Sequence, residues 1–129
     1  MTADAATIRA AIDAYAAAFS AGDREAYLGC FADDAWIEDP VGSPVRRGRD
    51  DIGAFFDEMR GMSDSTSLVL TGPVRVAAGE AAFPMQARPR IGESIFVMDI
   101  IDVMTFGDDG RITSMRAFWD AAEMRPVED

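Results

Sequence analysis

Residues 95–106 read IFVMDIIDVMTF, an almost wholly apolar run that contains two aspartates, Asp99 and Asp102. The run is rich in β-branched and aromatic residues, which predicts a strand buried on both faces of a sheet. Because successive side chains of a strand point to opposite faces, the two aspartates lie on opposite faces. An ionised carboxylate among apolar neighbours is costly unless it is paired, hydrogen-bonded or protonated. At least one of these acids therefore lowers the stability of the protein, and its presence requires a structural or functional explanation.

The turn after this run distinguishes the two aspartates. Residues 107–110 (GDDG) are a strong turn signal, and residues 111–119 are a plausible returning strand. A four-residue loop places Arg116 diagonal to Asp99, within reach of its long side chain, and offers Asp102 no cation. This register pairs Phe106 with Arg111, Asp102 with Met115, Ile100 with Ala117 and Met98 with Trp119. A β-bulge would invert the assignment of the two acids.

The composition restricts the chemistry that is available. The chain has a net charge of −11 and no histidine, and every cation in it is an arginine. The absence of histidine removes Ser-His-Asp and Cys-His mechanisms and most catalytic zinc or iron sites. The acidic charge argues against nucleic acid and anionic membrane surfaces as partners. With no P-loop, GxGxxG or CxxC motif, acid–base chemistry has to rest on carboxylates, tyrosine and arginine.

Length and hydropathy predict one domain covering residues 1–129, long enough to bury a sizeable core. Its apolar runs are too short to cross a bilayer. No charged-then-apolar signal segment opens the chain, and Cys30 has no second cysteine to pair with. We therefore expect a cytoplasmic protein.

The rest of the chain predicts helices first and strands afterwards, with Thr2 or Asp4, Asp23 and Asp50 as helix caps. The predicted helices run to about Ser20, from Arg24 to Phe31 and from Asp51 to about Arg60. At helical spacing, the buried side of the first helix carries Ile8, Ile12, Tyr15 and Phe19. The predicted strands cover residues 35–39, 67–71, 74–78, 81–91, 95–106 and 111–119. This order predicts an α+β domain with helices on one face of a curved, mostly antiparallel sheet that encloses an apolar pocket.

The short strand at residues 35–39 ends in a further acid, Asp39, just before Pro40. A residue that precedes proline is biased towards extended geometry. Asp39 should therefore follow the alternation of its strand and share a face with Ala35 and Ile37, while Glu38 points the other way.

Long stretches of the chain resemble the bacterial ketosteroid isomerases, members of the nuclear-transport-factor-2-like (NTF2-like, SnoaL-like) superfamily. The stretches are GDREAYLGCFADDAWIEDPVGSP (22–44), RRGRDDIGAFF (46–56), LTGPVR (70–75) and DIIDVMTFGDDGRITSMRAFW (99–119). Together they cover nearly the whole chain, in the family's order and spacing. The resemblance implies a conical α+β barrel with a deep apolar cavity, usually a homodimer, that needs neither metal nor cofactor.

The resemblance also implies roles for individual residues. Asp39 matches the general base, and Tyr15 and Asp102 match the phenol and the carboxylic acid that donate hydrogen bonds to the substrate oxygen. Trp119 matches a position whose indole N–H supports the base. Such a site moves a carbon–carbon double bond of a 3-oxo-Δ5 steroid into conjugation through a dienolate. The apolar residues expected to bind this flat ketone are Phe19, Phe55, Phe56, Phe83, Met85, Met98, Ile100, Met115, Ala117 and Trp119.

Taken singly, these residues have simpler interpretations. Tyr15 and Trp119 could be ordinary core residues, and Asp39 could be a turn residue before proline. The chain also departs from the family, because Phe31 and Phe56 stand where well-known members carry tyrosines that support the catalytic phenol. Two other functions therefore stay open: a polyketide-cyclase-like enzyme that acts on another enolisable ketone, and a non-catalytic carrier of hydrophobic ligands.

Overall fold

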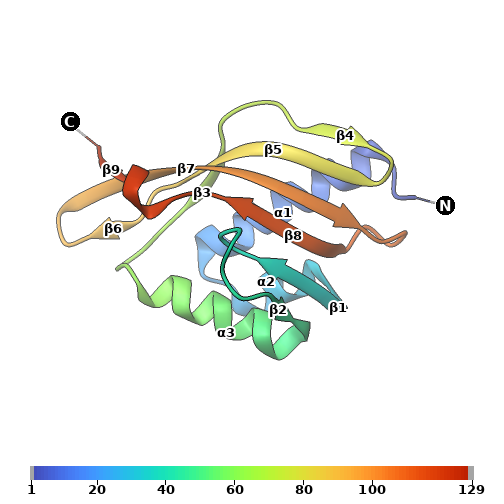
Figure 1. Ribbon diagram of the computed structural model, residues 1–129, viewed down its shortest axis with the longest axis horizontal. Helices are drawn as coiled ribbons and strands as arrows, with labels where there is room; N and C mark the ends of the chain where they lie inside the picture. Colours follow the sequence, from blue (N-terminus) through green and yellow to red (C-terminus); the bar gives the residue numbers. More distant parts are fainter. Residues whose placement is uncertain (1, 128–129) are drawn as a thin grey trace.

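A twisted sheet with helices along one of its faces makes up the protein (Figure 1). The computed structural model describes residues 2–127. Its helices are α1 (Ala5–Ala21), α2 (Arg24–Gly29), α3 (Gly48–Gly61) and the short 3₁₀ helix η1 (Ala121–Glu123). Its strands are β1 (Phe31–Glu38), β2 (Arg46–Arg47), β3 (Leu68–Leu70), β4 (Arg75–Ala77), β5 (Glu80–Ala87), β6 (Arg90–Ile91), β7 (Ser94–Phe106), β8 (Ile112–Phe118) and β9 (Arg125–Pro126).

The sheet is mixed but mostly antiparallel, which confirms the predicted α+β class. Its main strand order is β2-β1-β8-β7-β5-β3, while β4 pairs with β5, and β6 and β9 pair with β7. Neighbouring strands run antiparallel except for β1 and β8, which are parallel. Within residues 2–127, no helix has both the length and the apolar character needed to cross a membrane.

The first two helices begin at the predicted caps. The Asp4 carboxylate accepts a hydrogen bond from the Thr7 amide at 2.8 Å, and Asp23 does the same for Ala26 at 3.1 Å. Helix α1 ends at Gly22, whose φ of 70° is a left-handed conformation that glycine adopts without strain. As predicted, the helix buries Ile8, Ile12, Tyr15 and Phe19.

Several boundaries differ from the prediction, and the strand predicted over residues 35–39 is β1, which covers Phe31–Glu38. Helix α3 begins at Gly48, so Asp50 lies in its first turn and is not its cap; Asp51 accepts a hydrogen bond from the Arg47 amide instead. Phe31 opens strand β1, because α2 already ends at Gly29. The predicted strand at residues 81–91 is divided into β5 and β6 around Pro89, which cannot donate to the ladder.

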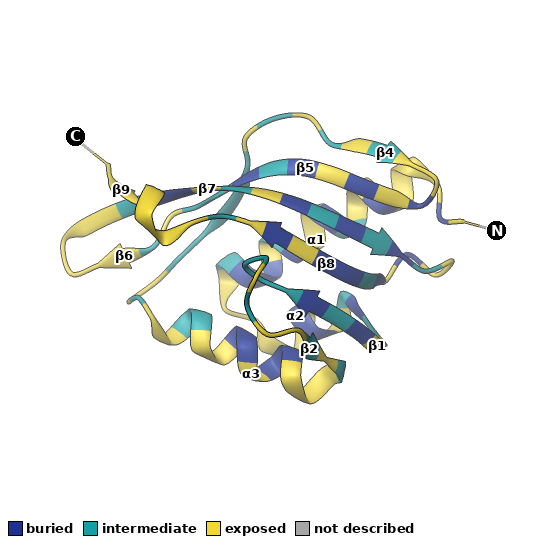
Figure 2. Ribbon diagram, viewed as in Figure 1, coloured by how far each residue is buried: buried dark blue, intermediate teal, exposed yellow. Residues whose placement is uncertain are grey.

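The two faces of β7 are not equally buried, contrary to the prediction. Buried and exposed positions alternate along its central part (Figure 2). Ile101 is 47% exposed. The predicted pairing with β8 is wrong by two residues: Asp102 lies opposite Ala117, after a bulge between Thr105 and Phe106. Because alternation along a strand has a period of two, a shift of two leaves every side chain on its predicted face.

The ion pair predicted between Asp99 and Arg116 is also wrong. Arg116 pairs with Glu38 at 3.0 Å. Asp99 instead accepts hydrogen bonds from Arg125 at 2.8 Å and from Gln86 at 3.0 Å. The prediction that Asp99 is paired therefore holds, but its cation comes from the C-terminal segment rather than from β8.

Candidate active site

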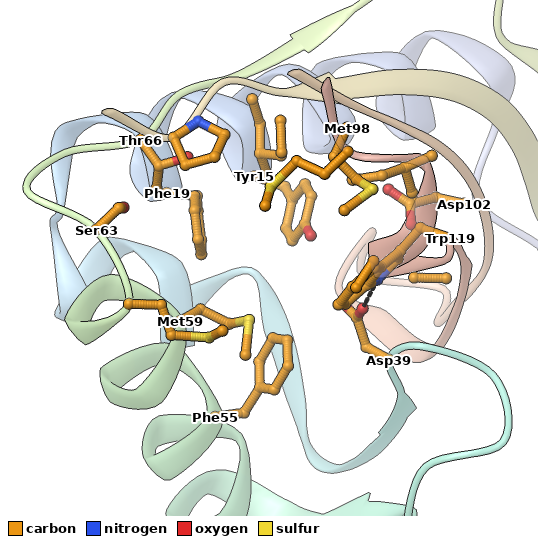
Figure 3. A pocket seen from close by; sticks show the side chains of 18 of the residues that line it. Tyr15, Phe19, Asp39, Phe55, Met59, Ser63, Thr66, Met98, Asp102 and Trp119 are labelled. Carbon is orange, nitrogen blue, oxygen red and sulfur yellow. Dashed lines mark hydrogen bonds between the residues drawn. The ribbon is translucent and has the colours of Figure 1, made fainter. Parts of the chain in front are cut away.

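An apolar cavity of about 220 Å³ lies between the helices and the inner face of the sheet. Helices α1 and α3 and strands β7 and β8 supply part of its wall (Figure 3). The end of β1, strands β3, β5 and β6, the loop after α3 and the segment around η1 supply the rest. The lining residues are Tyr15, Phe19, Asp39, Phe55, Met59, Met62, Ser63, Thr66, Leu68, Ala87, Pro89, Ile91, Met98, Ile100, Asp102, Ala117, Trp119, Ala121 and Met124.

Most of the predicted site residues meet at this cavity. The three predicted catalytic residues line it, together with Phe19, Phe55, Met98, Ile100, Ala117 and Trp119. The other predicted binding residues, Phe56, Phe83, Met85 and Met115, do not line it and are buried in the core. Met115 faces Ile37 and Met104 on the neighbouring strands, and the Phe56 ring lies 4.8 Å from the Tyr27 ring.

Several lining residues were not predicted as site residues. They are Met59, Met62, Ser63, Thr66, Leu68, Ala87, Pro89, Ile91, Ala121 and Met124. Met59 had a sequence signal, because it continues the apolar side of the third helix. The rest come from loops, strand ends and the short helix η1, where no periodic pattern marks the side that faces a cavity.

Asp39 lies at the end of β1 with its carboxylate at the cavity. It shares the inner face with the buried Ala35 and Ile37, as predicted from the strand alternation. The Trp119 indole N–H donates a hydrogen bond to Asp39 Oδ1 at 2.5 Å (Figure 3). Burial raises the pKa of Asp39 from 3.8 to about 6, although the Trp119 hydrogen bond and the charge of Arg46 act in the opposite direction.

Asp102 is the most deeply buried acid of the site, with 3% of its surface exposed. Its neighbours across the sheet are Phe83 on β5 and Ala117 on β8. Among residues 2–127, no cation forms a salt bridge with it. Burial raises the pKa of Asp102 well above its ordinary value, and the nearby charge of Asp39 raises it further. Asp102 is therefore held in its neutral form and has a proton to donate.

Tyr15 reaches the cavity from helix α1 and is 4% exposed. Burial raises the pKa of its phenol well above 10, and Tyr27, Asp102 and Asp39 raise it further. The phenol therefore stays protonated. Figure 3 shows Tyr15, Asp102 and Asp39 directed into the same part of the cavity.

This arrangement combines two neutral donors with one carboxylate that ionises near neutral pH. Neutral donors in a dry cavity can stabilise negative charge that develops on a substrate oxygen. A carboxylate with a pKa of about 6 can take up a proton and release it again near pH 7. Among the described residues, no group of three or more histidine, cysteine or acidic side chains is arranged to hold a metal ion.

The chain belongs to the SnoaL-like domain family, whose model matches residues 12–115. Within that family, it is a homologue of steroid Delta-isomerase. It is 42% identical over 119 residues to the steroid Delta-isomerase of Nocardioides simplex, an alignment that covers 92% of this chain and 94% of that protein.

Two further proteins are similar to this chain. Epoxide hydrolase LasB of Streptomyces lasalocidi is 33% identical over 89% of this chain, which spans 43% of LasB. The structure of the epoxide hydrolase/cyclase-like enzyme SalBIII matches with a TM-score of 0.85 and 24% identity, over 96% of this chain and 98% of that chain. The likeness to SalBIII shows that the fold is shared.

Proposed function

We propose that the protein is a ketosteroid isomerase that converts 3-oxo-Δ5 steroids into the conjugated Δ4 isomers. The observation that carries the proposal is the buried Asp102, which forms no salt bridge within residues 2–127, beside Tyr15 and Asp39 in an apolar cavity. A binding pocket gains little from two acids at its wall, since each costs free energy to bury. The 42% identity with a steroid Delta-isomerase over nearly the full length of both chains supports a steroid as the substrate.

The proposed reaction is an intramolecular proton transfer. The Asp39 carboxylate removes a proton from the carbon between the carbonyl and the alkene, and the electron pair moves towards the carbonyl oxygen to give a dienolate. Tyr15 and neutral Asp102 donate hydrogen bonds to that oxygen as its charge develops. The protonated Asp39 then returns its proton to the far end of the former alkene, which completes the isomerisation and restores the base.

The environment of Asp39 suits both halves of this cycle. A pKa of about 6 leaves the carboxylate mostly ionised near pH 7 yet basic enough to accept a carbon-bound proton. The Trp119 hydrogen bond at 2.5 Å holds the carboxylate in one orientation. Arg46 lowers the pKa of Asp39 but stays paired with Glu58 at 2.5 Å, so it tunes the base without neutralising it.

The test is turnover of 5-androstene-3,17-dione, followed by the ultraviolet absorbance of the conjugated enone. We expect the wild type to isomerise it, and Asp39→Asn to lose about 10²- to 10⁴-fold in kcat. Glu38→Gln is a matched control, because Glu38 is the adjacent acid and pairs with Arg116 outside the cavity. No turnover by the wild type, or an Asp39→Asn variant as fast as the wild type, contradicts the proposal. Tight steroid binding that is indifferent to Asp39→Asn would instead indicate a carrier.

A second candidate is an epoxide-opening or polyketide-cyclase-like enzyme, which the 33% identity with LasB favours. In that reaction, Asp102 would protonate an epoxide oxygen while Asp39 takes the proton of the attacking hydroxyl group. The isomerase is the stronger proposal, because the chain covers 94% of its isomerase relative and 43% of LasB. Turnover of a polyketide epoxide without any steroid isomerisation would reverse this order.

We further propose that the protein is a cytoplasmic homodimer that buries the apolar pair Ile101 and Phe118 on the outer face of β7 and β8. Ile101 and Phe118 lie directly opposite each other on that face and are 47% and 41% exposed. Contiguous exposed apolar surface marks sites of protein–protein contact, and this pair would form the centre of such a surface. Light scattering of the wild type should give twice the mass of one chain, and Phe118→Asp should lower the measured mass to that of one chain. A monomeric wild type contradicts this proposal.

A further inference from the structure

Tyr27 on helix α2 has a buried hydroxyl group that calls for an explanation. Its side chain is fully buried, and its Oη has no hydrogen-bond partner among residues 2–127. Burying an unsatisfied hydroxyl lowers the stability of a protein, and phenylalanine would fill the same space without that penalty. The hydroxyl therefore contributes no hydrogen bond to the folded structure described by residues 2–127.

The surroundings of Tyr27 point to Tyr15. The Tyr27 ring packs against four aromatic rings, with centroids 5.6 Å from Tyr15, 5.8 Å from Phe19, 5.2 Å from Phe31 and 4.8 Å from Phe56. Of these four neighbours, Tyr15 alone carries a hydroxyl. Tyr15 lines the cavity and Tyr27 does not, so Tyr27 lies behind Tyr15 as seen from the cavity.

The electrostatic surroundings agree with this geometry. Burial raises the pKa of Tyr27 well above 10, and the charges of Asp39 and Asp102 raise it further. Tyr15 responds to the same two carboxyl groups, and each tyrosine changes the pKa of the other. The two phenols therefore share one buried electrostatic environment, with ring centroids 5.6 Å apart, and in this conformation the Tyr27 hydroxyl forms no hydrogen bond with any of residues 2–127.

We propose that Tyr27 is a positioning residue that donates a hydrogen bond to Tyr15 Oη while Tyr15 donates to the substrate oxygen. As negative charge develops on that oxygen, Tyr15 Oη becomes a better acceptor, so the Tyr27 bond strengthens along the reaction. An interaction that is stronger in the transition state than in the bound substrate raises kcat rather than lowering KM. The inference rests on the isomerase function proposed above.

The same contact explains how Tyr15 is supported when Phe31 and Phe56 carry no hydroxyl. Both of these rings touch the Tyr27 ring, so the hydroxyl that they lack is supplied from helix α2 at the centre of the same cluster. The ring contacts also fix the direction of the Tyr27 side chain, because a fully buried aromatic side chain has little freedom to rotate away.

The test is Tyr27→Phe, which removes one oxygen atom and leaves the ring packing in place. We expect kcat for 5-androstene-3,17-dione to fall about 5- to 10-fold, the effect of one hydrogen bond, with KM within about twofold of wild type. The thermal midpoint of unfolding should stay the same or rise, since the unsatisfied hydroxyl is gone. Unchanged kcat, or a fall of kcat together with the thermal midpoint, contradicts the proposal.

A double-mutant cycle with Tyr15 isolates the contact. In a Tyr15→Phe background, Tyr27→Phe should have no further effect on kcat, because its acceptor is absent. An equal loss in both backgrounds contradicts a contact between the two hydroxyls.

Binding of a phenolic steroid gives a readout that does not need turnover. Such a ligand resembles the dienolate, and Tyr27→Phe should weaken its binding about 5- to 10-fold. A wild type that binds this ligand but isomerises nothing overturns the proposed function and leaves the Tyr27 contact standing. Equal binding by wild type and Tyr27→Phe overturns the contact alone.

Discussion

Asp99 and Asp102 stand three residues apart on β7 and have opposite surroundings. Asp99 is exposed on the outer face, where Arg125 and Gln86 donate hydrogen bonds that lower its pKa. Asp102 is 3% exposed on the inner face, where burial raises its pKa well above the ordinary value. The same residue type on the same strand is thus a charged surface group at one position and a neutral acid at the other.

The comparison shows what makes an aspartate available for catalysis on this sheet. Hydrogen bonds from Arg125 and Gln86, together with solvent, keep Asp99 in its charged form, which can only accept hydrogen bonds. The apolar neighbours Phe83 and Ala117 leave Asp102 its proton, and a neutral carboxylic acid can donate. The pleat of the strand directs the two side chains to opposite faces. Asp99 is therefore charged and Asp102 is neutral.

The largest expected difference between the two positions is in activity. Asp102→Leu removes the donor but keeps the branching at Cγ, and it should lower kcat about 10²- to 10³-fold, as the loss of a donor to an oxyanion typically does. Asp102→Asn keeps a neutral N–H donor and should lose about tenfold or less. Steady-state kinetics on 5-androstene-3,17-dione measures both.

Asp99→Asn is the matched control for these variants, and its kcat should stay within about twofold of wild type because its partners lie outside the cavity. Equal losses at positions 99 and 102 would remove the functional difference between the two faces. A larger loss for Asp102→Asn than for Asp102→Leu would contradict a neutral donor.

Stability should respond to pH in opposite directions at the two positions. The raised pKa of Asp102 means that its contribution to stability is present below about pH 4 and lost as the pH rises, by at most about 1.4 kcal/mol per pH unit. Between pH 4 and pH 8, the free energy of unfolding of Asp102→Asn should therefore rise relative to that of the wild type. Urea unfolding at a series of pH values measures this difference.

The lowered pKa of Asp99 reverses the sign. Its contribution is present above about pH 4 and lost as the pH falls, so Asp99→Asn should be less stable than wild type near pH 7 and approach it in acid. Parallel pH trends for the two Asn variants would show that both acids have the same charge state in the folded protein.

The smallest expected effect concerns the third acid of the sheet, Asp39. Its pKa of about 6 predicts that kcat/KM falls as the pH drops below 6, because the base becomes protonated. Trp119→Phe removes a hydrogen bond that favours the charged form, so the pKa of Asp39 and the acidic limb should both move to higher pH. A limb that does not move in this variant would show that the indole N–H does not tune the base.

The faces on which Asp99 and Asp102 lie could be predicted from the sequence because alternation along a strand is robust. The register of β7 and β8 is two residues away from the prediction, yet Asp102 stays on its face, since a shift of two preserves the alternation. The cation of Asp99 could not be predicted. Arg125 reaches it only because β9 folds back onto β7 after η1, a contact between distant segments that carries no local pattern.

The cavity wall was predicted less completely than the acids. The two-residue shift in register leaves Met115 in the core and brings Ala117 opposite Asp102. Phe83 and Met85 also share the inner face, but they pack into the core cluster with α1 rather than opening onto the cavity. Ser63 and Thr66 come from the loop after α3, whose path depends on tertiary contacts such as the hydrogen bond from Arg60 to the Thr66 carbonyl at 3.1 Å.

The protonation state of Asp102 is the central claim, and infrared difference spectroscopy tests it most directly. At about pH 7 an ordinary aspartate is ionised, so a carbonyl band of a neutral carboxylic acid marks a perturbed one. We predict such a band in the wild type, its loss in Asp102→Asn and its persistence in Asp99→Asn. A wild-type spectrum with carboxylate bands alone, or a neutral-acid band that survives undiminished in Asp102→Asn, would contradict the account.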